Sequence, residues 1–247
     1  MLLQKILFIA LISVLGMGKH VSKRLLSDSK IYGGKLKKDV DYIVAIAGTK
    51  TSLFCGGTII SKYFILTARH CPCIYQSNKY IPKTDNFTVS YGKSNFMLGT
   101  RKATSKIYCH ETQDIAILRL QSELPEFEAW RIATLADTYD VGDGNIALAA
   151  GWGKSSQNGT VVKSLHQIKL EIYPTCYWDH VICFGSSNGS ICEGDSGSPL
   201  TIDGVVIGVI SFLSASCGPS NASYPNGAVN VSSVYNWIAN IADINPN

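Results

Sequence analysis

The stretch Cys192-Glu193-Gly194-Asp195-Ser196-Gly197-Ser198-Pro199-Leu200 places a serine in a tight turn between glycines. The apolar run Val205–Phe212 that follows is typical of a buried strand. Glycine lets the backbone approach a bound carbonyl closely, so the N–H groups of Gly194 and Ser196 can both point at one oxygen. A serine hydroxyl alone is a weak nucleophile. The hypothesis that Ser196 is a nucleophile therefore requires a histidine base and a carboxylate that orients the histidine.

Two other segments can supply these partners. His70 ends the apolar segment Phe64–Cys71, where a disulfide at the cysteine would fix the imidazole. Asp114 directly precedes the apolar run Ile115–Leu120, and a carboxylate at the mouth of a buried strand needs a partner such as an imidazole N–H. Each residue alone also fits a structural role as a turn, cap or packing residue. All histidines after residue 31 precede Ser196, which excludes the α/β-hydrolase order of an esterase or lipase.

The composition indicates a globular all-β domain after a short prefix. The chain has 247 residues and 46% hydrophobic content, enough to bury a full core. Short apolar segments alternate with glycine-rich turns, as in a β-sandwich or β-barrel. The predicted strands are Tyr42–Ala47, Thr58–Ile60, Tyr63–Leu66, Phe87–Tyr91, Ile115–Leu120, Asn145–Gly151, His166–Ile172, Val205–Phe212 and Ala228–Val231. A looser stretch near 125–143 is the expected boundary between two β units.

One helix is expected at the end of the chain. Val234, Trp237, Ile238 and Ile241 recur at helical spacing. Ser232 or Ser233 is the expected N-cap of this helix.

The first 30 residues resemble a cleavable secretory prefix. Residues 1–18 hold Lys5 and an apolar run too short to cross a bilayer, which predicts a signal peptide rather than a membrane anchor. Residues 1–30 carry five Lys and Arg and one acid, the whole net charge of +4, so residues 31–247 are balanced with 17 bases and 17 acids. We therefore expect neither nucleic acid nor membrane as a partner. Eight cysteines behind such a prefix predict disulfides and an extracellular location rather than a metal site.

Six landmarks together resemble the trypsin/chymotrypsin-like serine proteases in their order along the chain, from Ile31 to the C-terminal helix. They are Ile31–Gly34, Cys55–Gly57, Leu66–Cys71, Asp114–Leu118, Gly151–Gly153 and Cys192–Gly197. The resemblance implies two packed antiparallel six-stranded β-barrels with a C-terminal α-helix and a catalytic cleft between the barrels. It implies a secreted serine endopeptidase that acts on protein or peptide substrates, without a cofactor, and is expected as a monomer.

The resemblance also implies the role of each site residue. His70 is the general base and acid, Asp114 orients it, Ser196 attacks the scissile carbonyl, and Gly194 and Ser196 form the oxyanion hole. Residues 19–30 become an activation propeptide, removed when an upstream trypsin-like protease cuts after Lys30. The freed amine of Ile31 would pair with Asp195. Protein protease inhibitors are possible further partners.

The same family likeness implies disulfides and a substrate pocket. The expected disulfides are Cys55–Cys71, Cys192–Cys217 and Cys176–Cys183, and the remaining cysteines, Cys73 and Cys109, pair less commonly in the family. The expected pocket residues are Ser190 and Ile191 at the floor, Glu193 at the rim, and Ser211, Phe212, Leu213 and Gly227 at the walls. Neutral Ser190 argues against Lys or Arg before the scissile bond. Leu213 and Ile191 favour an apolar residue there, small ahead of aromatic, and the far wall near Asn226 and Gly227 stays ambiguous.

Some features depart from the family pattern or lie outside it. Arg69 stands where alanine is usual and is expected to affect the packing or titration of the histidine, and Ser198 stands where glycine is usual. Glu193 is expected to disfavour acidic substrates. The sequons at Asn86, Asn158, Asn221 and Asn230 predict N-glycans, whereas Ser190 makes the sequon at Asn188 less favourable. The alternative function is a non-catalytic protease homologue that binds partners or acts as a decoy.

Overall fold

The computed structural model describes residues 33–39, 41–48, 54–126, 129–138, 144–214 and 217–244. The expected signal peptide, the activation prefix, Lys30 and Ile31 lie outside these described residues. Within the described residues, no helix is both long enough and apolar enough to cross a lipid bilayer.

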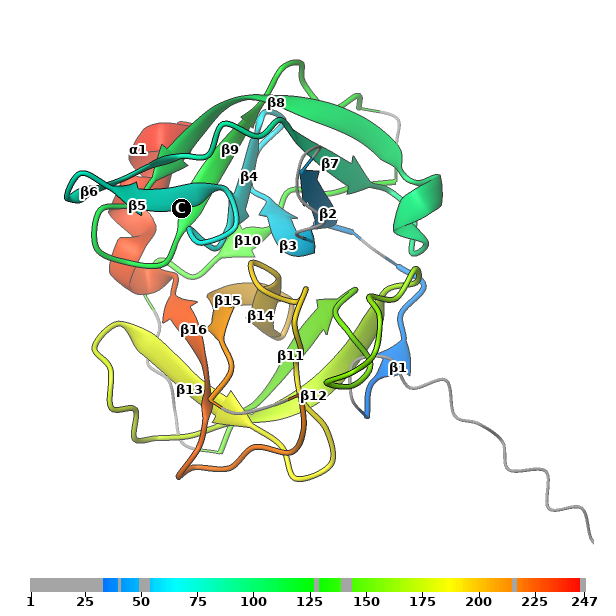
Figure 1. The fold of residues 1–247 in the computed structure, drawn as a ribbon, viewed down its shortest axis with the longest axis vertical. Helices are drawn as coiled ribbons and strands as arrows, with labels where there is room; N and C mark the ends of the chain where they lie inside the picture. Colours follow the sequence, from blue (N-terminus) through cyan, green and yellow to red (C-terminus); the bar gives the residue numbers. More distant parts are fainter. Residues whose placement is uncertain are drawn as a thin grey trace, which may run out of the picture.

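The first half of the chain forms a closed antiparallel barrel in the order β2-β3-β4-β9-β8-β7. Its strands are β2 Ile43–Gly48, β3 Phe54–Ile59, β4 Phe64–Thr67, β7 Phe87–Tyr91, β8 Thr100–Cys109 and β9 Ala116–Leu120. Branched aliphatic side chains of these strands, such as Ile59, Ile65 and Leu118, are fully buried in its core. β-branched residues favour the extended backbone and fill the barrel interior, which explains why these runs form strands. A hairpin of β5 (Cys73–Gln76) and β6 (Lys79–Pro82) projects beside this barrel (Figure 1).

The second half forms a second six-stranded barrel, because β12 pairs with both β11 and β13 and so closes the path β12-β11-β14-β15-β16-β13. Its strands are β11 Ile146–Gly151, β12 His166–Ile172, β13 Val181–Gly185, β14 Pro199–Ile202, β15 Val205–Phe212 and β16 Asn226–Asn230. Two short strands join its edges: β1 (Lys35–Leu36) pairs with β12, and β10 (Thr134–Leu135) pairs in parallel with β15. The expected fold of two antiparallel barrels is confirmed (Figure 1).

The C-terminal helix α1 (Tyr235–Ala242) returns to the first barrel, although it follows the last strand of the second. Ile238 and Ala242 are buried in the same hydrophobic cluster as Ile59 and Leu118. The expected serine N-cap is wrong. A 3-10 turn, η2 (Ser232–Val234), precedes α1, and Val234 occupies the cap position without a side-chain hydrogen bond.

The two serines do not occupy the cap position because both lie inside η2, and their hydroxyls donate back to Asn230. The Ser232 Oγ donates to the Asn230 side-chain oxygen at 2.9 Å, and the Ser233 Oγ donates to the Asn230 carbonyl at 2.7 Å.

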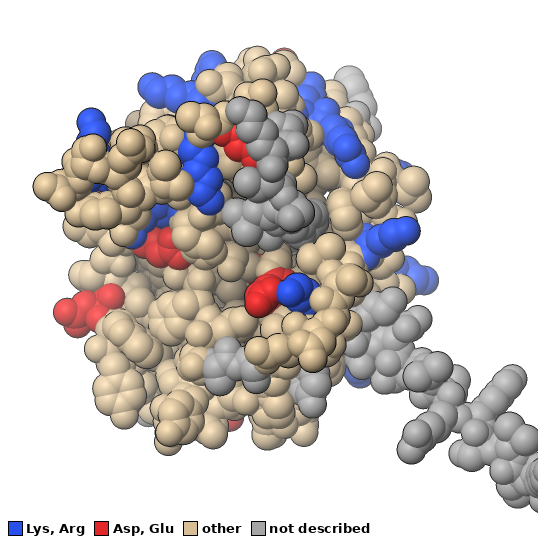
Figure 2. Space-filling view, in the orientation of Figure 1, with Lys and Arg blue, Asp and Glu red and all other residues tan. Residues whose placement is uncertain are grey.

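Charged side chains are unevenly distributed over the surface. On the face shown in Figure 2, most Lys and Arg side chains lie over the first barrel and are interrupted by acidic side chains, while the second barrel is mostly uncharged. This mixture gives the face no extended patch of one sign.

Candidate active site

His70 and Asp114 meet because their segments follow and precede neighbouring strands. β4 pairs with β9 through Thr67 and Ala116, which brings the residues just beyond these ends together. The His70 Nδ1 lies 2.7 Å from one Asp114 carboxylate oxygen, and the His70 backbone N–H donates to the other at 2.9 Å. Two bonds from one residue fix both the position and the orientation of the imidazole.

Asp114 also receives a hydrogen bond from the second barrel. The Ser211 Oγ donates to it at 2.6 Å. Burial alone would raise the pKa of Asp114, but the hydrogen bonds and charge of His70, together with the Ser211 hydroxyl, outweigh burial and hold this pKa below its ordinary value. Asp114 is therefore an ionised, oriented acceptor at neutral pH. Ser211, predicted as a pocket wall, has this additional contact, which sequence reasoning missed.

The turn that carries Ser196 is docked onto the first barrel. The Gly56 N–H of β3 donates to the Ser196 carbonyl at 2.8 Å, and the Cys71 sulfur lies 4.0 Å from that same carbonyl oxygen. A Cβ atom at Gly56 would overlap the Ser198 side chain, so only glycine allows this approach. These contacts place Ser196 beside Cys71, the residue that follows His70. No hydrogen bond joins the Ser196 hydroxyl to His70 among the described residues.

Left-handed glycines shape the same turn. Gly194 has a φ of 99° and Gly197 a φ of 82°, values that favour glycine. The Gly197 N–H donates to the Ile210 carbonyl at 2.7 Å. The backbone N–H groups of Gly194 and Ser196 donate to no acceptor within the described part of the chain. An oxyanion hole requires such unused backbone donors.

Ser198 introduces a polar group that the turn does not use. Its side chain is fully buried, and its hydroxyl has no hydrogen-bond partner among the described residues. A buried hydroxyl without a partner costs about 1–3 kcal/mol, so the serine that replaces the usual glycine is a local destabilisation.

Asp195 is a fully buried carboxylate. It accepts hydrogen bonds from the Gly153 N–H at 2.8 Å and the Cys192 N–H at 2.9 Å. Burial raises the pKa of Asp195 to about 7, and the two backbone hydrogen bonds only partly oppose this effect. Cβ atoms at Gly151 or Gly153 would overlap the carboxyl group, so these glycines form its cradle. No cation pairs with Asp195 within the described ranges.

The N-terminal end of the described chain packs on the backbone just before the predicted pocket floor. Gly33 packs so closely on the backbone of Asn188 and Gly189 that a Cβ atom would overlap the Asn188 carbonyl. Residues 188 and 189 immediately precede the predicted pocket floor at Ser190. The first described residue of the chain is therefore anchored beside this part of the second barrel.

The predicted pocket has a polar, internally satisfied floor. The Asn226 amide donates to the Ser190 Oγ and to the Ser220 Oγ, both at 3.1 Å, and all three residues are buried. Ile191 is also buried, and Leu213 is half-buried against the same cluster. Because the polar groups satisfy one another, the floor does not require a charged substrate group.

The two candidates for the far wall, Asn226 and Gly227, have different surroundings. A Cβ atom at Gly227 would overlap the Phe212 ring, so Gly227 lies under that ring, whereas the Asn226 side chain lies beside Ser190. Alternation along β16 sends adjacent side chains to opposite faces. The register of this strand is the signal that could have shown which of the two residues lies beside Ser190.

The rim residue Glu193 is paired. Its carboxylate forms an ion pair with Lys154, and its carbonyl accepts the Lys154 backbone N–H at 2.8 Å. The expected effect of its negative charge on acidic substrates is reduced accordingly, since a balanced pair repels less than an isolated carboxylate.

The structure forms disulfides Cys55–Cys71, Cys73–Cys109, Cys176–Cys183 and Cys192–Cys217. Sulfurs in the first of these lie close to a ring nitrogen of His70, but disulfide sulfurs are not thiolate ligands, so the cluster is no zinc site.

The predicted glycan sites differ in accessibility. Asn86, Asn158 and Asn221 are exposed. Asn230 is half-buried, and its side-chain oxygen accepts from the Ser232 N–H at 3.1 Å. Glycosylation at these positions stays a prediction.

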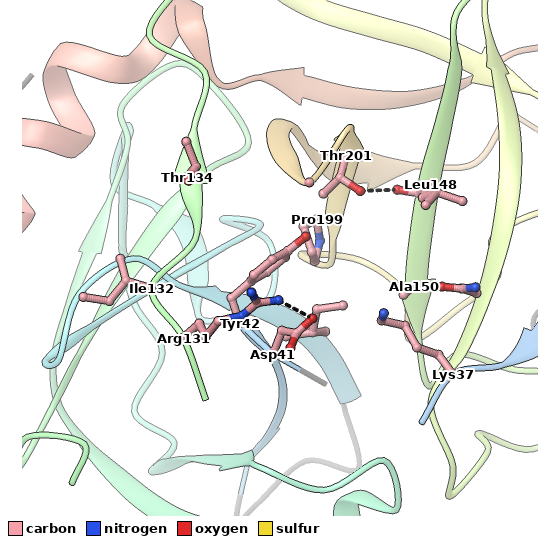
Figure 3. A pocket seen from close by; sticks show the side chains of 13 residues that line it. Lys37, Asp41, Tyr42, Arg131, Ile132, Thr134, Leu148, Ala150, Pro199 and Thr201 are labelled. Atoms are coloured by element: carbon pink, nitrogen blue, oxygen red, sulfur yellow. Dashed lines mark hydrogen bonds and ion pairs between the residues drawn. The ribbon is translucent and has the colours of Figure 1, made fainter. Parts of the chain in front are cut away.

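A cavity of about 320 Å³ between the barrels lies apart from the predicted site residues. In Figure 3, Asp41 and Tyr42 from the first barrel face Leu148 and Thr201 from the second. The Arg131 guanidinium pairs with Asp41 at 2.9 Å in its wall. None of the predicted site residues lines this cavity.

Comparisons with known proteins relate the chain to a family and a fold. The family model described as Trypsin matches residues 31–238. Serine protease SP24D of Anopheles gambiae is 28% identical over 239 residues, covering 91% of this chain and 86% of its own. Trypsin, alkaline B of Manduca sexta is 31% identical over 204 residues, covering 75% and 78%.

Among solved structures, neuropsin, a serine protease expressed in the limbic system of mouse brain, matches with a TM-score of 0.70. It is 23% identical and covers 85% of this chain and 99% of its own. At that identity the likeness concerns the fold alone.

Proposed function

The chain belongs to the trypsin family of serine endopeptidases, and from that membership we propose that it hydrolyses peptide bonds with His70, Asp114 and Ser196 through an acyl-enzyme. Membership of this family implies that the partners of the chain include protein substrates. The non-catalytic decoy is disfavoured because all three residue types stand at the matching positions of the sequence.

The observation that carries the proposal is the double hydrogen bond between His70 and Asp114, at 2.7 and 2.9 Å, beside the docked turn of Ser196. In the proposed reaction the His70 Nε2 takes the Ser196 proton as the hydroxyl attacks the carbonyl carbon. The Gly194 and Ser196 N–H groups bind the resulting oxyanion. His70 then gives the proton to the leaving amine, and water repeats the sequence to release the acid.

The proposal includes activation by cleavage after Lys30. A buried carboxylate without a cation is costly, and Asp195 is in that state in the described chain. The amine of a new Ile31 terminus would supply the missing charge, and Gly33, two residues further along, packs on Asn188 in the segment that leads to Asp195. The cleavage site needs an activator with trypsin-like specificity. Four disulfides support an extracellular location.

The proposed substrate preference is a small or medium apolar residue before the scissile bond. Asn226 fills the space beside Ser190, and Leu213 is expected to narrow the pocket from its wall, so a large aromatic side chain has little room. The floor carries no carboxylate to pair with Lys or Arg.

Replacing Asn226 with glycine is expected to deepen the pocket. The ratio of kcat/KM for Phe over Ala before the scissile bond should rise by about 10- to 100-fold, because burying several additional carbons contributes a few kcal/mol. Initial rates on two peptides that differ only at that residue measure the ratio. Asn78→Gly is the matched control, since Asn78 has a φ of 61° that glycine accepts. An unchanged ratio in Asn226→Gly would show that this side chain does not limit pocket depth.

The proposed function is tested on recombinant chain cut after Lys30 by an added trypsin-like protease. After that protease is inhibited and removed, we expect cleavage of library peptides after Ala, Val or Leu and labelling of Ser196 by an organophosphonate. A verified Ile31 terminus with neither turnover nor labelling would support the decoy function instead.

A further inference from the structure

Arg69 is a buried arginine next to the proposed catalytic histidine. It is 6% exposed, although a charged group in the interior requires compensation by hydrogen bonds or by other charges. Its guanidinium lies 3.4 Å above the centre of the Tyr80 ring, which belongs to β6. This cation–π contact supplies part of the compensation.

Two hydrogen bonds to a second loop supply further compensation, and the Arg69 Nε has no partner among the described residues. The Arg69 Nη1 donates to the His110 carbonyl at 2.8 Å and to the Glu111 carbonyl at 3.0 Å. These carbonyls lie a few residues before Asp114, and Arg69 directly precedes His70. One side chain therefore connects the backbone that carries the histidine to the backbone that carries the aspartate.

Lys83 binds the backbone of His70 and of the residue that follows it. Its Nζ donates to the His70 carbonyl at 2.8 Å and to the Cys71 carbonyl at 2.6 Å. Partial burial lowers the pKa of Lys83, as expected for an ammonium drawn against the protein surface. Lys83 follows β6 directly, so the hairpin delivers both this ammonium and the Tyr80 ring.

The hairpin is itself anchored to the Asp114 side. The disulfide Cys73–Cys109 joins the first residue of β5 to the last residue of β8, immediately before His110. The Lys83 backbone N–H also donates to the Pro72 carbonyl at 2.8 Å. The hairpin, Arg69 and Lys83 thus form one bracket around the His70 and Asp114 loops.

We propose that Arg69 and Lys83 are positioning residues that hold His70 and Asp114 in register for proton transfer. The inference rests on the proposed function, because it assumes that this pair performs the chemistry. Neither cation reaches the reacting atoms, and both act on backbone carbonyls. Their loss should lower kcat rather than substrate binding, since a displacement near 1 Å costs roughly 100-fold in rate.

The test compares Arg69→Met, Arg69→Lys and Lys83→Met in chain cut after Lys30, with concentrations set by active-site titration. Arg69→Met should lower kcat by about 10- to 100-fold with KM within about threefold. Arg69→Lys should recover part of the rate, because the lysine keeps the charge and can reach one carbonyl. Lys83→Met should also lower kcat, and it provides an independent test if Arg69→Met does not fold.

The chain offers a matched control for each cation. Arg119 also stacks on a tyrosine, Tyr63 at 5.6 Å, but it is exposed and belongs to β9, so Arg119→Met should leave kcat unchanged. Lys79 is an exposed lysine of the same hairpin, so Lys79→Met should also leave kcat unchanged.

A lower unfolding temperature with an unchanged kcat in both Arg69→Met and Lys83→Met would overturn the proposal and leave a structural role only. A rise in KM alone would overturn it too. Failure of the underlying function is distinguished by Ser196→Ala: if that variant keeps full activity, the triad is wrong, whereas an inactive Ser196→Ala beside a fully active Arg69→Met refutes only the bracket.

Discussion

Ser196→Ala is expected to lower kcat/KM by roughly a millionfold in the cleaved enzyme, the loss seen when another serine protease loses its nucleophile. Without the hydroxyl, no acyl-enzyme forms, and the remaining N–H donors can only stabilise attack by water. Initial rates on the best library peptide measure the loss, with mass spectrometry to exclude traces of the activating protease. Substrate affinity should persist, because the pocket residues are unchanged.

The control for this substitution is Ser122→Ala, at an exposed serine that accepts a hydrogen bond from Lys102 at 2.9 Å. It should keep the full rate. His70→Ala should lose about as much activity as Ser196→Ala, and the double variant should be no worse than either, because residues that act as one unit are not additive. Residual activity of Ser196→Ala above about 1% of the parent would contradict its assignment as the nucleophile, since losses of that kind are far larger.

The site residues were predictable where a residue of suitable chemistry stands at the end of an apolar run. His70 and Asp114 stand at the ends of apolar runs, and the structure brings these ends together through the pairing of β4 with β9. The sequence did not distinguish Asn226 from Gly227 as the residue beside Ser190, because a single residue of register decides which side chain of β16 faces it. The bracket was not predictable either, since Arg69 reaches carbonyls 41 and 42 residues away in sequence.

Apolar patterning predicted part of the fold, although the apolar strands β13 and β14 were not among the predicted strands. β7, β12 and β15 match the expected bounds, but β8 was missed, because Thr100–Cys109 is polar and only partly buried along its length. Its structure comes from backbone pairing with β7 and β9, which periodicity does not reveal. The serine N-cap failed because a 3-10 turn, η2, holds both serines and separates them from the start of α1.

Asp195→Asn is the second substitution with a large expected effect. Before cleavage it should remove a pH-dependent loss of stability, and after cleavage it should lower kcat. In the uncleaved chain, burial raises the pKa of Asp195 from 3.8 to about 7. Between these values the native carboxyl keeps its proton while the unfolded one loses it, so the free energy of unfolding falls as pH rises from about 4 to about 7. The total loss is on the order of 4 kcal/mol. Asparagine does not titrate, so the variant should lack this decline.

Urea unfolding of uncleaved chain between about pH 4.5 and pH 7.5 measures the effect. Both chains carry Ser196→Ala to prevent self-digestion. The stability of Asp195→Asn minus that of the parent should rise by about 1.4 kcal/mol per pH unit within the window. Asp203→Asn is the control, at an exposed aspartate with a φ of 49° that asparagine tolerates, and it should show no such slope. A flat difference for Asp195→Asn would mean that its carboxyl is already paired or solvated before cleavage.

After cleavage the substitution is expected to be harmful, because it lowers kcat. The same residue therefore also tests activation. A paired Ile31 amine would hold the Asp195 carboxylate ionised, and the turn between Asp195 and Ser196 would be fixed by that ion pair. Asparagine cannot form the pair, so cleaved Asp195→Asn with an intact Ser196 should lose roughly 100- to 1,000-fold in kcat, comparable to loss of an oxyanion-hole donor. A variant that lacks the fall in stability with pH before cleavage and is nearly inactive after it would show that the buried carboxylate destabilises the precursor and serves the enzyme. Full activity in cleaved Asp195→Asn would instead require the turn to be competent without any ion pair.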